Sequence, residues 1–104
     1  MSLEIKSANQ LKEVLNTNKK VVVDFYAVWC GPCQRLGQIM HDVEKEYEDV
    51  VFAKVNVDEV PELATEYGVY SIPQVNLFKD GKQTEMFVGA RDAQSLKQII
   101  DRAL

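Results

Sequence analysis

The sequence has no long hydrophobic run and no excess of positive charge. Its longest unbroken apolar stretch covers six residues, from Phe25 to Cys30, whereas a helix needs about 20 apolar residues to span a bilayer. Lys and Arg number 12 against 16 Asp and Glu, which gives a net charge of −4 at pH 7. Proteins that bind nucleic acids or anionic membranes rely on cationic surfaces. The charge balance therefore argues against a nucleic-acid partner and against a membrane partner.

Signals for export, linkers and repeats are also missing. Residues Met1 to Glu4 carry neither the basic nor the apolar region of a secretory leader, so we expect a cytoplasmic protein. A mature chain that had lost its leader would look the same. No repeat or linker rich in proline and glycine interrupts the 104 residues, and this length predicts one domain over residues 1–104.

Glycines are few, and their spacing excludes one class of cofactor site. None of the five forms a Gly-x-Gly pair, so the chain lacks the fingerprint of a dinucleotide-binding loop. We therefore expect no bound cofactor. A redox role would need electrons from another protein.

Only two cysteines are present, Cys30 and Cys33, and two residues separate them. A disulfide between them would stabilise the fold by roughly 2 kcal/mol, because it closes a very short loop. Such a pair is a poor structural crosslink, so we predict a disulfide that opens and closes reversibly. Two other interpretations are buried free cysteines and a zinc site. A structural zinc site needs four ligands and His41 is the only histidine, so we expect no metal and expect His41 near the surface.

The hydrophobic pattern alternates between segments typical of strands and of helices. The sequence predicts strands over residues 3–5, 20–27, 50–57, 74–79 and 83–88. It predicts helices that open at Ser7 and at Asp92, a long helix over 33–47, and a short helix capped by Asp58 or Glu59, with Pro61 in its first turn and Gly68 at its end. The segment 20–27 is apolar on both faces, which predicts a central strand.

The order of these segments, β-α-β-α-β-α-β-β-α, predicts an α/β fold. Alternating strands and helices favour a parallel sheet with helices on both faces. Asp80-Gly81 is a strong hairpin signal and would add an antiparallel pair at the C-terminal end. We expect a central mixed sheet.

The segment Trp29-Cys30-Gly31-Pro32-Cys33 lies where the central strand ends and the long helix begins. A thiolate at Cys30 would be stabilised by the helix N-terminus, which lowers the pKa of a thiol. Pro32 suits the first turn of the helix. Gly31 would allow a tight turn and leave the sulfur uncovered. Cys33 lies one turn further along and could attack a mixed disulfide formed at Cys30.

Asp24 lies within the apolar segment that precedes this motif. We expect it to be buried, with a pKa above the ordinary value of about 3.9. The alternative is a half-exposed carboxylate at the end of the strand. A buried carboxylate here is a candidate base for deprotonating Cys33.

At residues 29–33 the sequence resembles the thioredoxin family, and the resemblance extends over nearly the whole chain. It is carried further by Asp24-Phe25, Lys54-Val55-Asn56-Val57-Asp58, Gly68, Ile72-Pro73, Phe78-Lys79-Asp80-Gly81 and Val88-Gly89. It implies the thioredoxin fold and a general reductant of protein disulfides. Such a chain would be reduced in turn by an NADPH-dependent thioredoxin reductase.

The resemblance also implies roles for single residues. Cys30 would be the attacking thiolate and Cys33 the resolving thiol. Asp24 would be the buried proton acceptor behind Cys33, with Lys54 as its usual partner. Gly31 and Pro32, which lie between the two cysteines, would have a supporting role.

Four further residues would contact the substrate by the same resemblance: Trp29, Ile72, Pro73 and Gly89. Pro73 matches a cis-proline whose loop lies beside the disulfide. From the residues alone, Trp29 could instead be a core or edge aromatic, and Gly89 could be a bulge glycine.

The chain departs from the usual family pattern at Tyr26, Gln34, Gln38 and Gln74, where Trp, Lys, Pro and Thr are common. None of these changes removes a group that the mechanism needs. Two other functions stay open at this point: a binding module of the same fold without redox turnover, and an oxidant or isomerase. The redox poise of such a pair depends on small pKa differences that the sequence does not fix.

Overall fold

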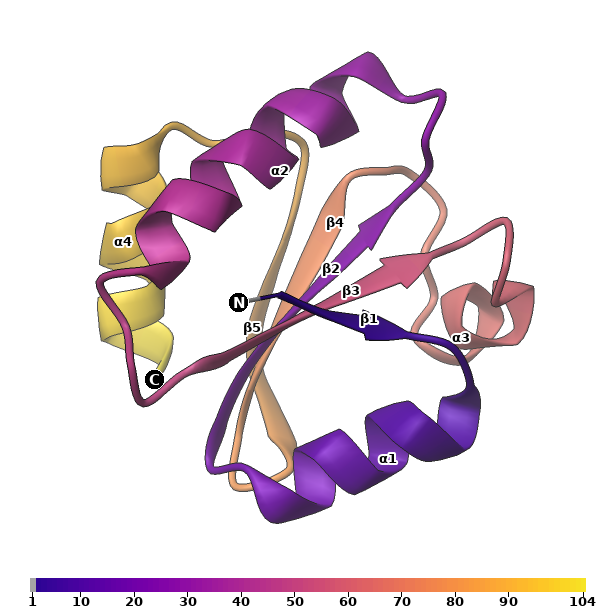
Figure 1. Ribbon diagram of the computed structural model, residues 1–104, viewed down its shortest axis with the longest axis horizontal. Coiled ribbons are helices and arrows are strands. Elements are labelled where there is room, and N and C mark those ends of the chain that lie inside the picture. The colour runs from indigo at the N-terminus through magenta and orange to yellow at the C-terminus, as the bar shows by residue number, and fades with distance from the viewer. Residues whose placement is uncertain (1) are drawn as a thin grey trace.

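The computed structural model describes residues 2–104 and contains one five-stranded sheet with the strand order β1-β3-β2-β4-β5 (Figure 1). The strands are β1 (Ser2–Ile5), β2 (Lys20–Tyr26), β3 (Val51–Asn56), β4 (Gln74–Lys79) and β5 (Lys82–Val88). The helices are α1 (Ala8–Thr17), α2 (Gly31–Glu44), α3 (Pro61–Glu66) and α4 (Ala93–Ala103).

The sheet is mixed, as the order of elements predicted. Strands β1 and β2 run parallel to β3, while β4 runs antiparallel to β2 and to β5. Figure 1 shows α2 and α4 on one side of the sheet and α1 and α3 on the other. This confirms the predicted α/β architecture and its antiparallel hairpin. Asp80 and Gly81 in the turn have φ angles of 53° and 79°, as a tight hairpin turn requires.

Strand β2 is the central strand, and both of its faces are buried. Val21, Val23 and Phe25 belong to the apolar cluster on the side of α1 and α3. Val22 belongs to the cluster under α2 and α4. Because side chains alternate along a strand, Asp24 points to the same side as Val22, toward α2.

The long helix is displaced from its predicted bounds. Helix α2 begins at Gly31, earlier than the predicted Cys33, because the side chain of Cys30 caps it by accepting from the backbone of Cys33. It ends at Glu44 rather than Tyr47. Tyr47 still packs against the cluster under α2 and α4, so apolar spacing continued past the end of the helix.

The predicted cap of the short helix was wrong. Helix α3 is preceded by Val60, which makes no side-chain capping bond, rather than capped by Asp58 or Glu59. A carboxyl oxygen of Asp58 accepts instead from the indole of Trp29. Pro61 does open the helix, and Gly68 follows its end with a φ of 63°, which is the left-handed conformation expected there.

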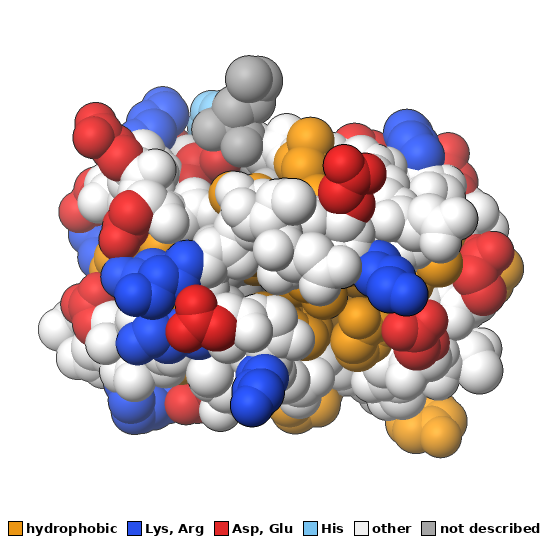
Figure 2. Space-filling model, turned by 90° about the horizontal axis from the view of Figure 1, so that it is seen from below, with side chains coloured by type: hydrophobic (Ala, Val, Ile, Leu, Met, Phe, Trp, Pro, Cys, Tyr) orange, Lys and Arg blue, Asp and Glu red, His pale blue; other side chains and the backbone are white. Residues whose placement is uncertain are grey.

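Figure 2 shows the molecule from the α1 side, with acidic and basic side chains interspersed on this face. No helix within residues 2–104 is long and apolar enough to cross a membrane.

Candidate active site

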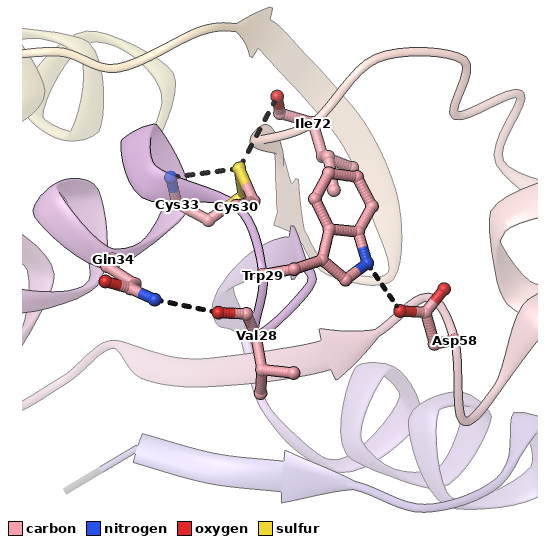
Figure 3. The surroundings of a disulfide bond; sticks show 7 residues. All are labelled: Val28, Trp29, Cys30, Cys33, Gln34, Asp58 and Ile72. Atoms are coloured by element: carbon pink, nitrogen blue, oxygen red, sulfur yellow. Dashed lines mark hydrogen bonds between the residues drawn. A yellow bond between two sulfur atoms is a disulfide. The ribbon is translucent and has the colours of Figure 1, made fainter.

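The site is built around a disulfide at the N-terminus of α2. Cys30 and Cys33 are bonded to each other, with Cα atoms 5.2 Å apart. The backbone N–H of Cys33 points at Sγ of Cys30 over 3.2 Å (Figure 3). The turn after β2 is closed by a hydrogen bond from the N–H of Cys30 to the carbonyl oxygen of Ala27. The first sulfur therefore lies at a helix N-terminus, where negative charge is stabilised.

Both cysteines are more buried than the sequence suggested. Cys30 is 6% exposed and Cys33 3% exposed. They pack with Ala27 and with the partly buried Ile72. Gly31 does not take a left-handed conformation, so the predicted tight turn is not what requires glycine here. A Cβ added at Gly31 would meet the tip of the Arg35 side chain at 3.8 Å, an ordinary contact.

Trp29 lies on the surface beside the disulfide, not in the core. Its side chain is 70% exposed, and its indole Nε1 donates to Oδ2 of Asp58 over 2.9 Å (Figure 3). Nearby, the amide of Gln34 donates to the carbonyl oxygen of Val28 over 2.7 Å. These bonds hold the rim of the site, and sequence reasoning missed Asp58 as part of it.

The loop before β4 brings backbone groups to the disulfide. The Ile72–Pro73 peptide bond is cis, and the carbonyl oxygen of Ile72 lies 4.0 Å from Sγ of Cys30. The N–H of Gly89 donates to the carbonyl oxygen of Pro73 over 2.8 Å. The sheet's register shift lies at Leu77/Phe78, so Gly89 is not a bulge glycine but a close neighbour of Pro73.

One exposed aromatic on this loop was not anticipated. Tyr70 is 96% exposed and precedes Ile72 by two residues. Val28 is also strongly exposed, next to Trp29. An aromatic residue in a short loop, one residue removed from an Ile-Pro pair, was the available signal.

Asp24 is buried, as predicted. Its side chain is 1% exposed, and within residues 2–104 neither carboxyl oxygen has a hydrogen-bond partner. Burial raises the pKa of Asp24 to about 7; the positive charge of Lys54 lowers it and the negative charge of Glu4 raises it. A carboxyl with such a pKa can exchange a proton near neutral pH.

Lys54 is the neighbour of Asp24 on the adjacent strand, but its ammonium group contacts the aromatic ring of Tyr26. Its Nζ lies 4.4 Å from the centroid of the Tyr26 ring. The Tyr26 hydroxyl donates to Oε2 of Glu4 over 2.9 Å, and burial, with this hydrogen bond, raises the pKa of Tyr26 to about 12. Sequence reasoning named Tyr26 at this site only as a departure from the family and did not name Glu4 as a site residue.

An open pocket of about 670 Å³ is shared by Tyr26, Lys54 and the second cysteine of the disulfide. It is lined by Cys33, Gly37, Tyr26 and Lys54 among others. His41 lies at its edge and is exposed, as predicted. Within residues 2–104, no group of three or more His, Cys, Asp or Glu side chains is arranged to hold a metal ion.

Comparisons with known proteins agree with this geometry. A family model described as Thioredoxin matches residues 2–102. The thioredoxin of Mycoplasmoides gallisepticum is 45% identical over 96 residues, which cover 92% of this chain and 96% of that protein. The thioredoxin of Chlamydia caviae is 40% identical over 100 residues, or 96% of this chain and 97% of that one. A solved structure of Plasmodium falciparum thioredoxin superposes with a TM-score of 0.91 at 33% identity, covering 98% of this chain and 99% of that chain.

Proposed function

This chain belongs to the thioredoxin family, and from that premise we propose a division of labour among its site residues. The chain is a thiol-disulfide oxidoreductase, a carrier that cycles between a Cys30–Cys33 dithiol and the disulfide. The family acts on disulfide-containing targets. Our proposal concerns the direction of transfer, the order of the two thiols and the source of electrons.

Cys30 is the attacking thiolate. The position of its sulfur at the N-terminus of α2, facing the backbone N–H of Cys33 at 3.2 Å, is the observation that carries this assignment. A helix N-terminus stabilises the thiolate over the thiol, which makes the sulfur a nucleophile near neutral pH. Attack on a target disulfide forms the bond between Cys30 and the target and releases the other target sulfur as a thiolate.

Cys33 resolves the mixed disulfide with help from Asp24. The Cys33 thiol gives its proton to the Asp24 carboxylate, and the electron pair of the new thiolate forms the bond to Cys30. In the same displacement the bond between Cys30 and the target breaks, and the target sulfur leaves as a thiolate with the electron pair of that broken bond. Over both steps the target disulfide gains two electrons and the cysteine pair loses them. Lys54, close to Asp24, adjusts the strength of this base.

Substrate contacts come from the exposed face around the sulfur. Trp29 offers an aromatic surface, Ile72 offers its carbonyl oxygen and a partly buried side chain, and Gly89 and the buried Pro73 offer backbone. Gly31 and Pro32 form the first turn of α2 between the two cysteines. Targets are proteins with accessible disulfides.

Electrons come from an NADPH-dependent thioredoxin reductase, and the chain works in the cytoplasm. The absence of a Gly-x-Gly loop from the sequence supports an external electron source. A reductant of disulfides belongs in a compartment that keeps thiols reduced.

The test is reduction of insulin disulfides by this chain with NADPH, with and without added thioredoxin reductase. We expect NADPH oxidation and insulin reduction only when the reductase is present, and neither with Cys30→Ser. Oxidation of NADPH by this chain alone would contradict the proposed electron source. A glutathione equilibrium that leaves the pair mostly dithiol would contradict the reducing direction, because the chain would then be a strong oxidant.

A further inference from the structure

Three charged residues form a row across the sheet beneath α2. Glu4 on β1 pairs in register with Lys54 on β3, and Lys54 pairs in register with Asp24 on β2. Residues paired in register point to the same face of a sheet. Val22, two residues before Asp24, packs against the apolar side chains of α2. The whole row therefore faces the helix that carries Cys33.

Tyr26 contacts two members of this row, Glu4 and Lys54, while the third, Asp24, has no hydrogen-bond partner among residues 2–104. Its hydroxyl donates to Glu4 over 2.9 Å, and Lys54 Nζ lies over its ring, 4.4 Å from the centroid. Within the part of the chain that the structure describes, no carboxylate lies within ion-pair distance of Lys54. The ammonium thus contacts the aromatic ring and not Asp24, its neighbour in register.

Two of these groups, Tyr26 and Lys54, share a pocket with the resolving cysteine. Besides Cys33, the titratable groups that α2 adds to the wall of this pocket are His41 and Asp42. On the other side of β2, Asp24 is paired with the apolar Val75 of β4, so the charge that Asp24 experiences comes chiefly from the row itself.

We propose that Glu4 and Tyr26 are positioning residues for the step in which Cys33 resolves the mixed disulfide. Together they hold Lys54 over the aromatic ring, and this keeps the Asp24 carboxylate unpaired and able to take up a proton. The inference deepens the proposed function, because it rests on Asp24 as the proton acceptor.

Electrostatics gives the direction of the effect. The negative charge of Glu4 raises the pKa of Asp24, and the positive charge of Lys54 lowers it. An ammonium in contact with a carboxylate lowers its pKa further and makes it a weaker base. Loss of Glu4 would therefore act twice, by removing a negative charge and by releasing Lys54 toward Asp24.

The experiment is an NMR titration of the Asp24 carboxyl carbon in the oxidised protein. Glu4→Gln removes the negative charge and replaces the carboxylate acceptor of the Tyr26 hydroxyl with a neutral amide oxygen, which holds the ring and the ammonium above it less strongly. Glu13→Gln on α1 removes the same charge from a site away from the row and is the matched control. We expect Glu4→Gln to lower the midpoint by about one pH unit, and Glu13→Gln to leave it unchanged.

Two further comparisons separate positioning from charge alone. In a Lys54→Met background, the shift caused by Glu4→Gln should become smaller, because no ammonium remains to be released. Tyr26→Leu should lower the midpoint more than Tyr26→Phe, which keeps the ring. Equal shifts with and without Lys54 would overturn the positioning role, and so would a Glu4→Gln shift no larger than that of Glu13→Gln.

The rate of target reduction tests the underlying role of Asp24 separately. If Asp24 accepts the proton, Glu4→Gln slows insulin reduction at pH 8 by about threefold, and Asp24→Asn slows it further. If Asp24→Asn leaves the rate and its pH profile unchanged, the proposed function of Asp24 fails, and with it the catalytic meaning of the row. The titration shifts would still be seen in that case, so the two failures are distinguishable.

Discussion

The backbone N–H of Gly89 donates to the carbonyl oxygen of Pro73 over 2.8 Å, which ties the end of β5 to the loop that faces the disulfide. Gly89 has a φ of 94°, a conformation that side-chain-bearing residues rarely adopt. The carbonyl oxygen of Ile72 lies 4.0 Å from Sγ of Cys30, so the bond between Gly89 and Pro73 holds the backbone beside the disulfide, which is the surface we propose for target contact.

Gly89→Ala should lower the free energy of unfolding by about 1–2 kcal/mol, because alanine is strained at this φ. Urea unfolding of the oxidised protein measures the change. Gly37→Ala is the matched control: Gly37 lies inside α2, where the new Cβ would find Lys54 Nζ at 3.8 Å, an ordinary contact. Gly37→Ala should raise the free energy of unfolding by up to about 1 kcal/mol, because alanine has a higher helix propensity than glycine. Equal effects of the two substitutions would refute the role of φ at Gly89.

Asp24→Asn should stabilise the oxidised protein more at pH 8 than at pH 4. The folded pKa of Asp24 is about 7, against an ordinary value of 3.8. Well below pH 4 both states hold the proton, and at pH 4 the cost of Asp24 is only about half a kcal/mol. As the pH rises from about 4 to 7 the unfolded chain loses the proton first, and the native state becomes less stable by up to about 4 kcal/mol. Urea unfolding at both pH values checks this, and equal changes would rule out a raised pKa.

Asp49→Asn should show the opposite pH dependence. A hydrogen bond from Lys20 holds the pKa of the exposed Asp49 below its ordinary value. The ionised Asp49 therefore stabilises the fold above the pKa that it has in the unfolded chain. This stabilisation is lost as the pH falls through its lower pKa in the folded protein. The substitution should destabilise at pH 8 and have little effect at acidic pH. The same unfolding series measures it, and a stabilisation at pH 8 would be inconsistent with this account.

Trp29→Ala should impair reaction with protein targets and leave the fold intact. The side chain is exposed and its hydrogen bond to Asp58 lies at the surface, so unfolding should change by less than about 1 kcal/mol. Truncating an aromatic anchor at a binding surface commonly costs about 2 kcal/mol, which predicts a fall of roughly 30-fold in kcat/KM for insulin. The kcat/KM for a small-molecule disulfide, which contacts less of this surface, should fall less. Similar losses for both substrates would argue against a docking role.

Much of the fold was predictable because local patterns and tertiary packing agree. The apolar segment around Asp24 predicted a central strand and a buried carboxylate, and the structure has both. The pair Asp80-Gly81 predicted the hairpin through backbone preference alone. At Cys30 and Cys33, spacing and position at the start of a helix identified the site without any knowledge of the rest of the sheet.

The errors came from contacts between residues far apart in the sequence. Asp58 has a strong preference for capping a helix, but it bonds the indole of Trp29 instead. Tyr47 follows the apolar spacing of α2 but lies beyond the end of the helix. It is held there by packing against the cluster under α2 and α4 and by a hydrogen bond from its hydroxyl to Asp101 on α4. The bond between Tyr26 and Glu4 crosses β3 and depends on the strand order. None of these partners could be read from local sequence.

The most direct test of the central claim is capture of a mixed disulfide. Cys33→Ser is incubated with an oxidised target protein, and the covalent product is identified by non-reducing electrophoresis and peptide mass spectrometry. Cys30→Ser under the same conditions is the matched control. The account predicts a stable bond between Cys30 and a target cysteine in the first variant and little or none in the second. Capture through Cys33 in the Cys30→Ser protein, with none through Cys30, would contradict it.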